Sequence, residues 1–152
     1  MENIRIIEKR DYPERLLEIP EPPKKLFVRG KLPSLEHKFL CIVGSRKYTN
    51  YGKEACEKII NGLRGFPITI VSGLALGIDS IAHRSALDMK LPTVAFPGSG
   101  LHPNVLYPRS NVGLAEKIVA NDGALVSEFE PEFRATPYSF PQRNRLMAGL
   151  AD

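Results

Sequence analysis

Three short segments rich in glycine and serine follow apolar runs in this sequence, and one of them carries an arginine. They are Gly44-Ser45-Arg46, Ser72-Gly73-Leu74-Ala75-Leu76-Gly77 and Pro97-Gly98-Ser99-Gly100. Glycine lets backbone N–H groups approach an anion closely, and a helix that begins at such a turn adds partial positive charge. The chemistry that these segments suit is the binding of a phosphate or a phosphodiester.

Basic residues gather in two stretches of the chain. Residues 39–65 hold five basic residues against two acidic ones, and residues 134–146 contain Arg134, Arg143 and Arg145 with no acid. If the two stretches meet in space they form a positive patch; otherwise they are two separate solvated faces. The net charge of the 152 residues is +4, a mild excess that permits an anionic partner without identifying one.

Two common nucleotide motifs are absent. The dinucleotide fingerprint G-x-G-x-x-G fails because Arg46 stands where the second glycine belongs, and Ser72-Gly73 offers no acid for a ribose. The sequence also lacks the phosphate-loop pattern G-x-x-x-x-G-K-[ST]. We therefore expect neither nicotinamide redox chemistry nor ATP hydrolysis, and no cofactor.

Asp79 and His83 are the pair that could act in catalysis, because they lie four residues apart on a predicted helix. They could form a general-base dyad, or Asp79 could be a first-turn acid with His83 as its hydrogen-bond partner. We favour the structural interpretation, and expect no catalytic residue and no enzyme activity.

Histidine and cysteine residues are few and far apart. His37, His83 and His102 lack metal-ligand spacing, and Cys41 and Cys56 are too few for a four-ligand zinc site or a disulfide framework. The charged N-terminus is not a signal peptide, and no run reaches the roughly 20 apolar residues of a membrane helix. We expect no metal site, no membrane contact and a reducing cytoplasm.

From residue 39 onwards, apolar runs alternate with helical patterns, and this rhythm predicts the fold. Runs at 39–43, 68–71, 93–96 and 124–126 are typical of strands buried on both faces. Such an order predicts parallel βαβ units with helices on both faces, that is, a Rossmann-like three-layer α/β fold with a mostly parallel sheet. Ligands of such sheets bind beyond the carboxyl ends of the strands, where the glycine-containing segments lie.

The first 38 residues have a different character. They are rich in proline and show no sustained period, although residues 24–30 read as a short edge strand that ends at a glycine turn. We expect a short N-terminal extension, residues 1–38, packed on the edge of the sheet of a single domain at 39–152.

An ordered set of motifs gives the sequence a family resemblance. The set comprises Tyr12-Pro13, Pro22-Pro23, Leu26-Phe27-Val28-Arg29-Gly30, Ile42-Val43-Gly44-Ser45-Arg46, Ser72-Gly73-Leu74-Ala75-Leu76-Gly77-Ile78-Asp79, Tyr107-Pro108, Gly123-Ala124-Leu125-Val126-Ser127-Glu128 and Phe140-Pro141-Gln142-Arg143-Asn144-Arg145. Each motif is weak alone, but together they closely resemble the bacterial DNA-processing protein A (DprA, or Smf) family from about residue 10 onwards.

The resemblance implies an extended Rossmann fold that binds and protects single-stranded DNA and loads RecA recombinase onto it in natural transformation. It matches Gly44-Ser45-Arg46 to the family's phosphate loop, and the stretch from Phe140 to Arg145 to its basic FPxRNR segment. The residues expected to bind DNA phosphates are Gly44, Ser45, Arg46, Ser72, Gly73, Gly77, Gly98, Arg143, Asn144 and Arg145.

Two departures from the family pattern accompany these matches. His102 stands where family members usually have an acid, a change that should leave anion binding intact. Family members also continue beyond the position of Asp152 with strands and helices that carry the homodimer surface. The chain is therefore expected to be C-terminally incomplete relative to the family, with dimerisation and RecA loading not implied for it alone.

Two other functions stay open at this point. One is a nucleotide phosphoribohydrolase of a related Rossmann-like group, whose Pro-Gly-Gly-x-Gly-Thr-x-x-Glu motif corresponds here to Pro97-Gly98-Ser99-Gly100-Leu101 without the threonine and glutamate. The other is a nucleotide-sensing domain that uses the same phosphate-binding edge without chemistry. Release of free base from a nucleotide and binding of oligo-dT distinguish the three.

Overall fold

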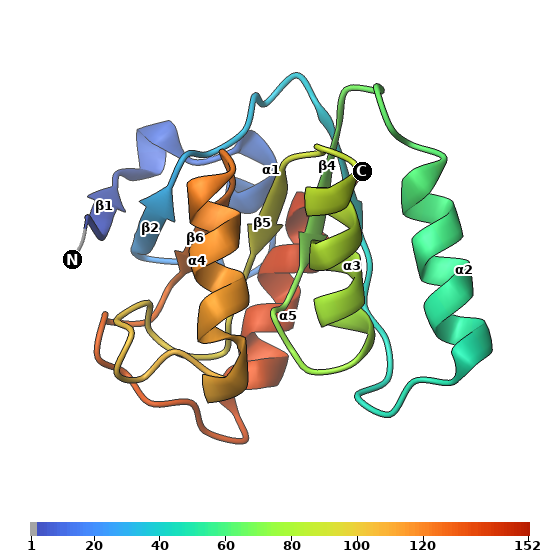
Figure 1. The fold of residues 1–152 in the computed structure, drawn as a ribbon. Coiled ribbons are helices and arrows are strands. Elements are labelled where there is room, and N and C mark those ends of the chain that lie inside the picture. Colours follow the sequence, from blue (N-terminus) through green and yellow to red (C-terminus); the bar gives the residue numbers. More distant parts are fainter. Residues whose placement is uncertain (1–2) are drawn as a thin grey trace.

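The computed structural model describes residues 3–152, which form six strands and five α-helices (Figure 1). The strands are β1 (Arg5–Ile7), β2 (Leu26–Gly30), β3 (Lys38–Cys41), β4 (Ile68–Ser72), β5 (Thr93–Ala95) and β6 (Ala124–Ser127). The helices are α1 (Glu14–Leu17), α2 (Asn50–Asn61), α3 (Ile78–Asp88), α4 (Val112–Ala120) and α5 (Ser139–Leu150), with 3-10 turns at Lys9–Asp11 and Arg109–Asn111.

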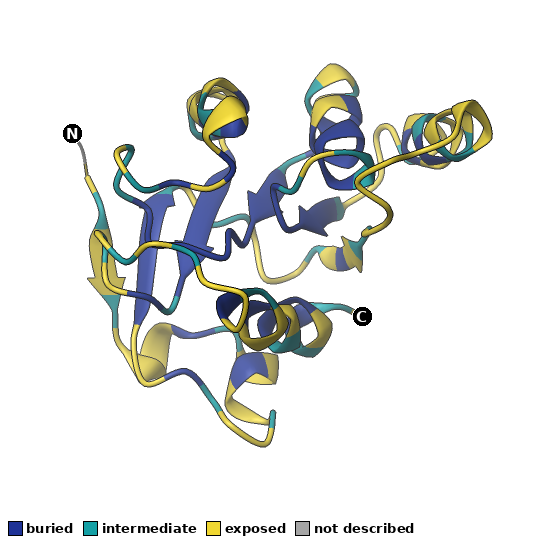
Figure 2. Cartoon of the chain, turned by 90° about the horizontal axis from the view of Figure 1, so that it is seen from below, coloured by how far each residue is buried: buried dark blue, intermediate teal, exposed yellow. Residues whose placement is uncertain are grey.

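All six strands belong to one sheet with the order β1-β2-β6-β5-β4-β3. Strands β3, β4, β5 and β6 are parallel, with Leu40 opposite Ile70 and Val71 opposite Val94. Strand β2 pairs antiparallel with β6, and β1 pairs antiparallel with β2. Helices α2, α3 and α4 lie on one side of the sheet and α1 and α5 on the other (Figure 2). The predicted Rossmann-like three-layer fold with a mostly parallel sheet is confirmed.

The prediction that every parallel strand is buried on both faces is wrong for β3. The strand lies at the edge of the sheet and buries Phe39, whereas Leu40 on its other face is 36% exposed. Apolar runs at β4, β5 and β6 do mark buried strands. An apolar run indicates that a segment is a strand. The position of that strand in the sheet decides how far its side chains are buried.

The edge strand predicted over residues 24–30 is also placed differently. Strand β2 pairs with β6 on one side and with β1 on the other, so β1 is the edge strand and β2 lies inside the sheet. Arg29 projects from β2 and donates two hydrogen bonds of 2.7 Å to the Glu116 carboxylate on α4. This bidentate pair, in which Arg29 is buried and Glu116 is half exposed, joins β2 to the helix layer.

The core lies on both faces of the sheet. Leu146, Met147 and Leu150 of α5 pack with Val71 and other sheet residues on one face, and residues of α2, α3 and α4 pack on the other. The parallel strands all point their carboxyl ends to the same edge of this sheet, where the glycine-containing turns lie. None of the helices in the described part of the chain is long and apolar enough to cross a lipid bilayer.

Candidate functional site

Two of the glycine-containing turns lie against each other at the carboxyl-terminal edge of the sheet. The first turn (residues 44–46) follows β3, and the second turn (residues 73–77) follows β4. The Ile78 N–H donates to the Ser45 carbonyl at 3.1 Å. Gly77 has a φ of +83°, and a Cβ at this position would overlap the Ser45 carbonyl oxygen. Glycine is therefore required here, both for the backbone conformation and for the contact between the turns.

Buried polar side chains hold the second turn in place. The Asn111 amide Nδ2 donates to the Leu74 carbonyl and to the Ser80 hydroxyl, both at 2.8 Å. The Ser80 hydroxyl donates to the Ala75 carbonyl at 2.7 Å. Leu74 has a positive φ of 61°, a conformation that a non-glycine residue keeps only where its surroundings impose it. Sequence reasoning missed Asn111, because an asparagine in an irregular segment carries no periodic signal.

The Asp79 carboxylate interacts with backbone groups of both turns. It is 4% exposed and accepts a hydrogen bond from the Gly73 N–H at 3.1 Å. Burial raises the pKa of Asp79, while hydrogen bonds from the backbone N–H groups of Gly73, Ala75 and Gly44 and the charge of Arg143 act to lower it. The acid thus organises backbone donors of both turns.

The expected partnership between Asp79 and His83 is not formed, so that prediction is wrong. His83 is fully buried; its Nδ1 lies 2.8 Å from the Thr93 hydroxyl, and its Nε2 accepts from the Leu74 N–H at 3.3 Å. Burial lowers the pKa of His83 to about 3. The neutral His83 ring therefore joins Leu74 of the second turn to Thr93 of β5. Because His83 makes no hydrogen bond to Asp79, the two residues do not form an acid–base dyad.

Arg143 reaches this edge from α5 on the opposite side of the sheet. Its guanidinium is 6% exposed, and Nη1 donates to the carbonyls of Gly73, at 2.9 Å, and of Phe96. Its Nε donates to the Asn144 side chain at 2.8 Å. Its Nη2 makes no hydrogen bond to any residue between 3 and 152, so this buried cation retains donors for a further acceptor.

Arg46 and Arg143 both lie close to one aromatic ring, that of Phe140. Their Cζ atoms are 5.9 and 5.6 Å from the centre of the Phe140 ring, within the range of cation–π attraction. Arg46 is exposed, and among the described residues no carboxylate lies within ion-pair distance of it. Burial lowers the pKa of Arg143, Asp79 opposes this effect, and the nearby Arg46 adds to it. An anion between the two guanidinium groups would relieve their repulsion.

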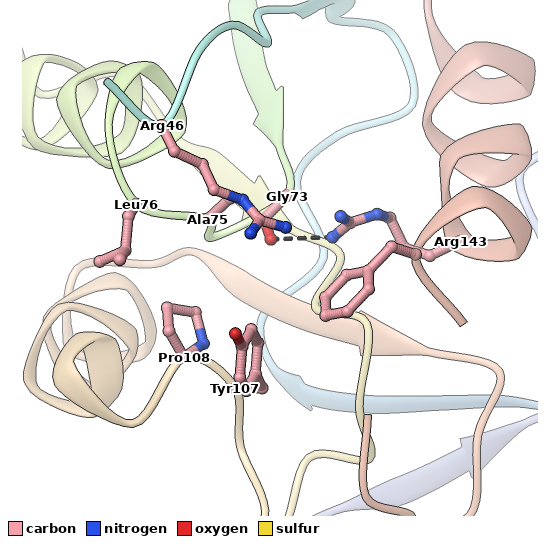
Figure 3. A pocket seen from close by; sticks show the side chains of 8 residues that line it. Arg46, Gly73, Ala75, Leu76, Tyr107, Pro108 and Arg143 are labelled. Atoms are coloured by element: carbon pink, nitrogen blue, oxygen red, sulfur yellow. Dashed lines mark hydrogen bonds between the residues drawn. The ribbon is translucent and has the colours of Figure 1, made fainter. Parts of the chain in front are cut away.

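A small cavity of about 40 Å³ opens between these groups (Figure 3). Five of the residues around it had not been assigned to the site from the sequence alone. The lining contains no acidic residue and consists of Arg46, Gly73, Ala75, Leu76, Tyr107, Pro108, Phe140 and Arg143. Gly98 lies behind the ring, because a Cβ there would stand 2.5 Å from a Phe140 carbon. The cavity therefore joins a cationic end to an apolar wall.

Ser45 and Ser72 from the predicted set use their hydroxyl groups within the protein. The Ser72 hydroxyl is buried and donates to the Ile42 carbonyl at 2.6 Å, which ties the ends of β3 and β4 together. The Ser45 hydroxyl bonds both backbone groups of Lys47 at 3.0 Å and shapes the first turn. Neither serine lines the cavity, and Gly44 lies at the exposed start of the first turn.

Arg145 lies away from the cavity. Its guanidinium donates to both oxygens of Glu128, at 2.5 and 2.8 Å, and also to the carbonyls of Glu21 and Gln142. The structure thus unites Arg46 and Arg143 from the two basic stretches, and gives Arg145 an acidic partner instead. Throughout the described ranges, no cluster of three or more His, Cys, Asp or Glu residues could hold a metal ion.

The model of the family DNA recombination-mediator protein A matches residues 3–152 of this chain. The chain belongs to this family. It is 40% identical over 140 residues to the protein Smf of Escherichia coli K12, covering 92% of this chain and 37% of that protein. It is 42% identical over 139 residues to DNA processing protein DprA of Streptococcus pneumoniae R6, covering 91% of this chain and 48% of the relative.

Solved structures of DprA proteins share the fold. The Streptococcus pneumoniae DprA structure matches 98% of this chain and 52% of its own, with a TM-score of 0.85 and 36% identity. The Helicobacter pylori DprA structure, described for its unique single-stranded DNA binding mode, matches 100% of this chain and 69% of its own, with a TM-score of 0.81 and 30% identity. The chain spans about half the length, or less, of the curated DprA and Smf relatives named here.

Proposed function

We propose that this chain binds single-stranded DNA, and that a phosphate of the strand is held between Arg46 and Arg143 in the cavity. The observation that carries this proposal is a pair of guanidinium groups beside one ring, of which Arg46 has no acidic partner in the described chain and Arg143 retains unused donors. The family membership and the single-stranded DNA binding described for the Helicobacter pylori relative support it.

The arrangement suits a phosphodiester better than a simple counter-ion. A guanidinium presents a planar fork of N–H donors that matches two phosphate oxygens, whereas a lysine offers one point charge. Arg143 is held by its bonds to the Gly73 and Phe96 carbonyls, while Arg46 is exposed at the surface. The site thus offers one buried and one exposed guanidinium to the same phosphate.

We propose no catalytic step for this site. The Asp79 carboxylate accepts from the N–H of Gly73, which lines the cavity, and the His83 ring nitrogens contact the Thr93 hydroxyl and the Leu74 N–H. The phosphoribohydrolase motif supplies a glutamate, and the cavity lining contains no carboxylate, histidine or cysteine. Incubation with nucleoside monophosphates should release no free base; release that disappears in Asp79→Asn would reinstate the enzyme.

Binding of a fluorescent oligo-dT, followed by anisotropy, tests the proposal. Arg46→Ala should weaken binding by about 10- to 150-fold, the equivalent of about 1.5–3 kcal/mol for a hydrogen bond to a charged group. Arg46→Lys should recover part of the loss. The matched control is Arg64→Ala, which removes the same charge from an exposed residue in the turn after α2, at the opposite edge of the sheet. Equal affinities of Arg46→Ala and the wild-type chain would contradict the proposal.

We further propose, from the family resemblance, that RecA recombinase is the protein partner and the cytoplasm the compartment. Cys41 and Cys56 are both free, which suits a reducing environment. A strand-exchange assay tests RecA as the partner directly. When this chain is added to RecA and to single-stranded DNA that is covered by a single-strand-binding protein, the lag before strand exchange should shorten. An unchanged lag would assign RecA loading to other parts of the family's longer proteins.

A further inference from the structure

We infer that the segment of residues 12–23, called the N-terminal brace below, positions Arg143 by holding α5 against the sheet. The inference rests on the proposed function and adds to it the part of the molecule that keeps the buried cation in place. Arg143 reaches the sheet edge from α5, and its bonds to the Gly73 and Phe96 carbonyls depend on the position of that helix. Whatever holds α5 therefore controls the contact between Arg143 and a phosphate.

Helix α5 is enclosed between the sheet and the N-terminal brace. Three side chains of α5 pack in the core with residues of the sheet, and Leu16 of α1 belongs to the same buried cluster. Figure 2 shows α1 on the side of α5 that faces away from the sheet. The Tyr12 hydroxyl donates to the Pro23 carbonyl at 3.2 Å, which joins the two ends of the brace. The brace is thus a closed loop against the outer side of α5.

Two arginines bond the brace to α5 through main-chain carbonyls. Arg15 of the brace donates to the Ala151 carbonyl, directly after α5, at 3.0 Å. Arg145 of α5 donates from Nε to the Glu21 carbonyl of the brace at 3.1 Å, and its other nitrogens donate to both carboxylate oxygens of Glu128. The Glu128 side chain is 9% exposed and follows β6. One guanidinium therefore joins the brace, α5 and the end of β6.

An apolar contact lies between these two polar ones. Gly149 of α5 faces Ile19 of the brace so closely that a Cβ at position 149 would overlap the Ile19 Cγ2 atom. Glycine is a poor helix former, and the close approach of the brace explains why it stands within α5. Brace residues 15, 19 and 21 meet Ala151, Gly149 and Arg145 in turn. The brace therefore follows α5 back towards the end of the helix that carries Arg143.

Gly149→Ala tests the inference without changing any charge. The added methyl group overlaps Ile19, so the brace and α5 must separate and Arg143 should lose its fixed place. Oligo-dT binding should weaken about 2- to 30-fold, the range for substitutions that act through a coupled network. The slope of log affinity against log salt concentration should fall by about 0.7, the value for one lost phosphate contact.

Two further variants show whether the overlap itself is responsible. Ile19→Ala, combined with Gly149→Ala, removes the overlapping methyl group and should restore both the affinity and the salt slope. Gly113→Ala in α4 is the matched control, because an added Cβ there meets no atom within 4 Å, and it should bind like the wild-type chain. A double variant that binds as weakly as Gly149→Ala would overturn the inference.

Glu128→Ala provides a second test, which decides the matter if circular dichroism shows that Gly149→Ala does not fold. The change removes an acid, so simple attraction between the chain and DNA would make binding tighter. Loss of the carboxylate that holds Arg145 should instead weaken oligo-dT binding about 2- to 30-fold. Tighter binding would show that the released Arg145 contacts the strand itself, and it would overturn the inference.

The outcomes separate the brace from the proposed function. A folded Gly149→Ala chain with a lower free energy of unfolding but wild-type affinity and salt slope would reduce the brace to a purely structural role and overturn the inference. The proposed function would survive that result, because Arg46→Ala would still weaken oligo-dT binding. Indifference of binding to Arg46→Ala would instead refute the proposed function itself.

Discussion

The buried His83 should make the stability of the chain sensitive to acid. In the folded state the Thr93 hydroxyl donates to the Ile70 carbonyl at 2.9 Å, so its oxygen accepts from the His83 Nδ1–H. Nε2 accepts from the Leu74 N–H, so a proton added there would face another donor. The contact at Nε2 therefore requires the neutral ring, whereas the contact at Nδ1 can form in either protonation state, and burial lowers the pKa of His83 to about 3.

The size of the effect follows from this pKa. A histidine in the unfolded chain has a pKa near 6.5, so between that value and about 3 the unfolded state binds the extra proton and the folded state does not. The stabilisation is complete above the unfolded pKa and is lost as pH falls through this window. At pH 4.5 the loss corresponds to two pH units, or about 2.7 kcal/mol at 1.36 kcal/mol per unit.

Urea unfolding of the wild-type chain and His83→Gln at pH 7 and pH 4.5 measures this loss. The fold also lowers the pKa values of Glu116 and Asp152 and raises that of Asp79, but these groups are common to both proteins. The wild-type chain should lose about 2–3 kcal/mol more than His83→Gln between the two pH values. Equal losses in the two proteins would show that His83 is not held neutral and would refute the reasoning.

Two further substitutions test how the site is built. Asp79→Ala should lower the free energy of unfolding by about 2–4 kcal/mol in urea titrations, because it leaves the Gly73 N–H unpaired and removes the negative charge nearest to the buried Arg143; a loss below half a kcal/mol would contradict this. Gly98→Ala should displace the Phe140 ring, cost about 1–3 kcal/mol and weaken oligo-dT binding. Its control, Gly113→Ala in α4, meets no atom within 4 Å and should be neutral or slightly stabilising, and a similar effect of the two would refute the packing argument.

The layers of the fold could be predicted because they depend on local patterns. Continuous apolar runs identify β4, β5 and β6 as buried strands. Strand order could not be read in this way. Whether β3 lies at an edge, and whether β1 covers β2, depends on long-range pairing that leaves no periodic trace in the sequence.

The cationic half of the site was likewise accessible from the sequence. Arg46 and Arg143 follow from their positions in charged segments and at the end of a strand, because parallel strands bring their carboxyl ends to one edge. The apolar half was not, since Leu76 and Tyr107 resemble ordinary core residues until their exposure is known. The expected pair of Asp79 and His83 failed for a related reason: spacing places two residues on one helix face, but burial decides what each one contacts.

The salt dependence of oligo-dT binding tests the central claim most directly, namely that Arg46 contacts a phosphate of the strand. Affinity should fall as salt rises, and each phosphate contact contributes about 0.7 to the slope of log affinity against log salt concentration. Arg46→Ala should reduce the wild-type slope by about 0.7, the value for one lost contact, whereas Arg64→Ala should leave it unchanged. A slope in Arg46→Ala equal to that of the wild-type chain, or a wild-type affinity indifferent to salt, would contradict the account.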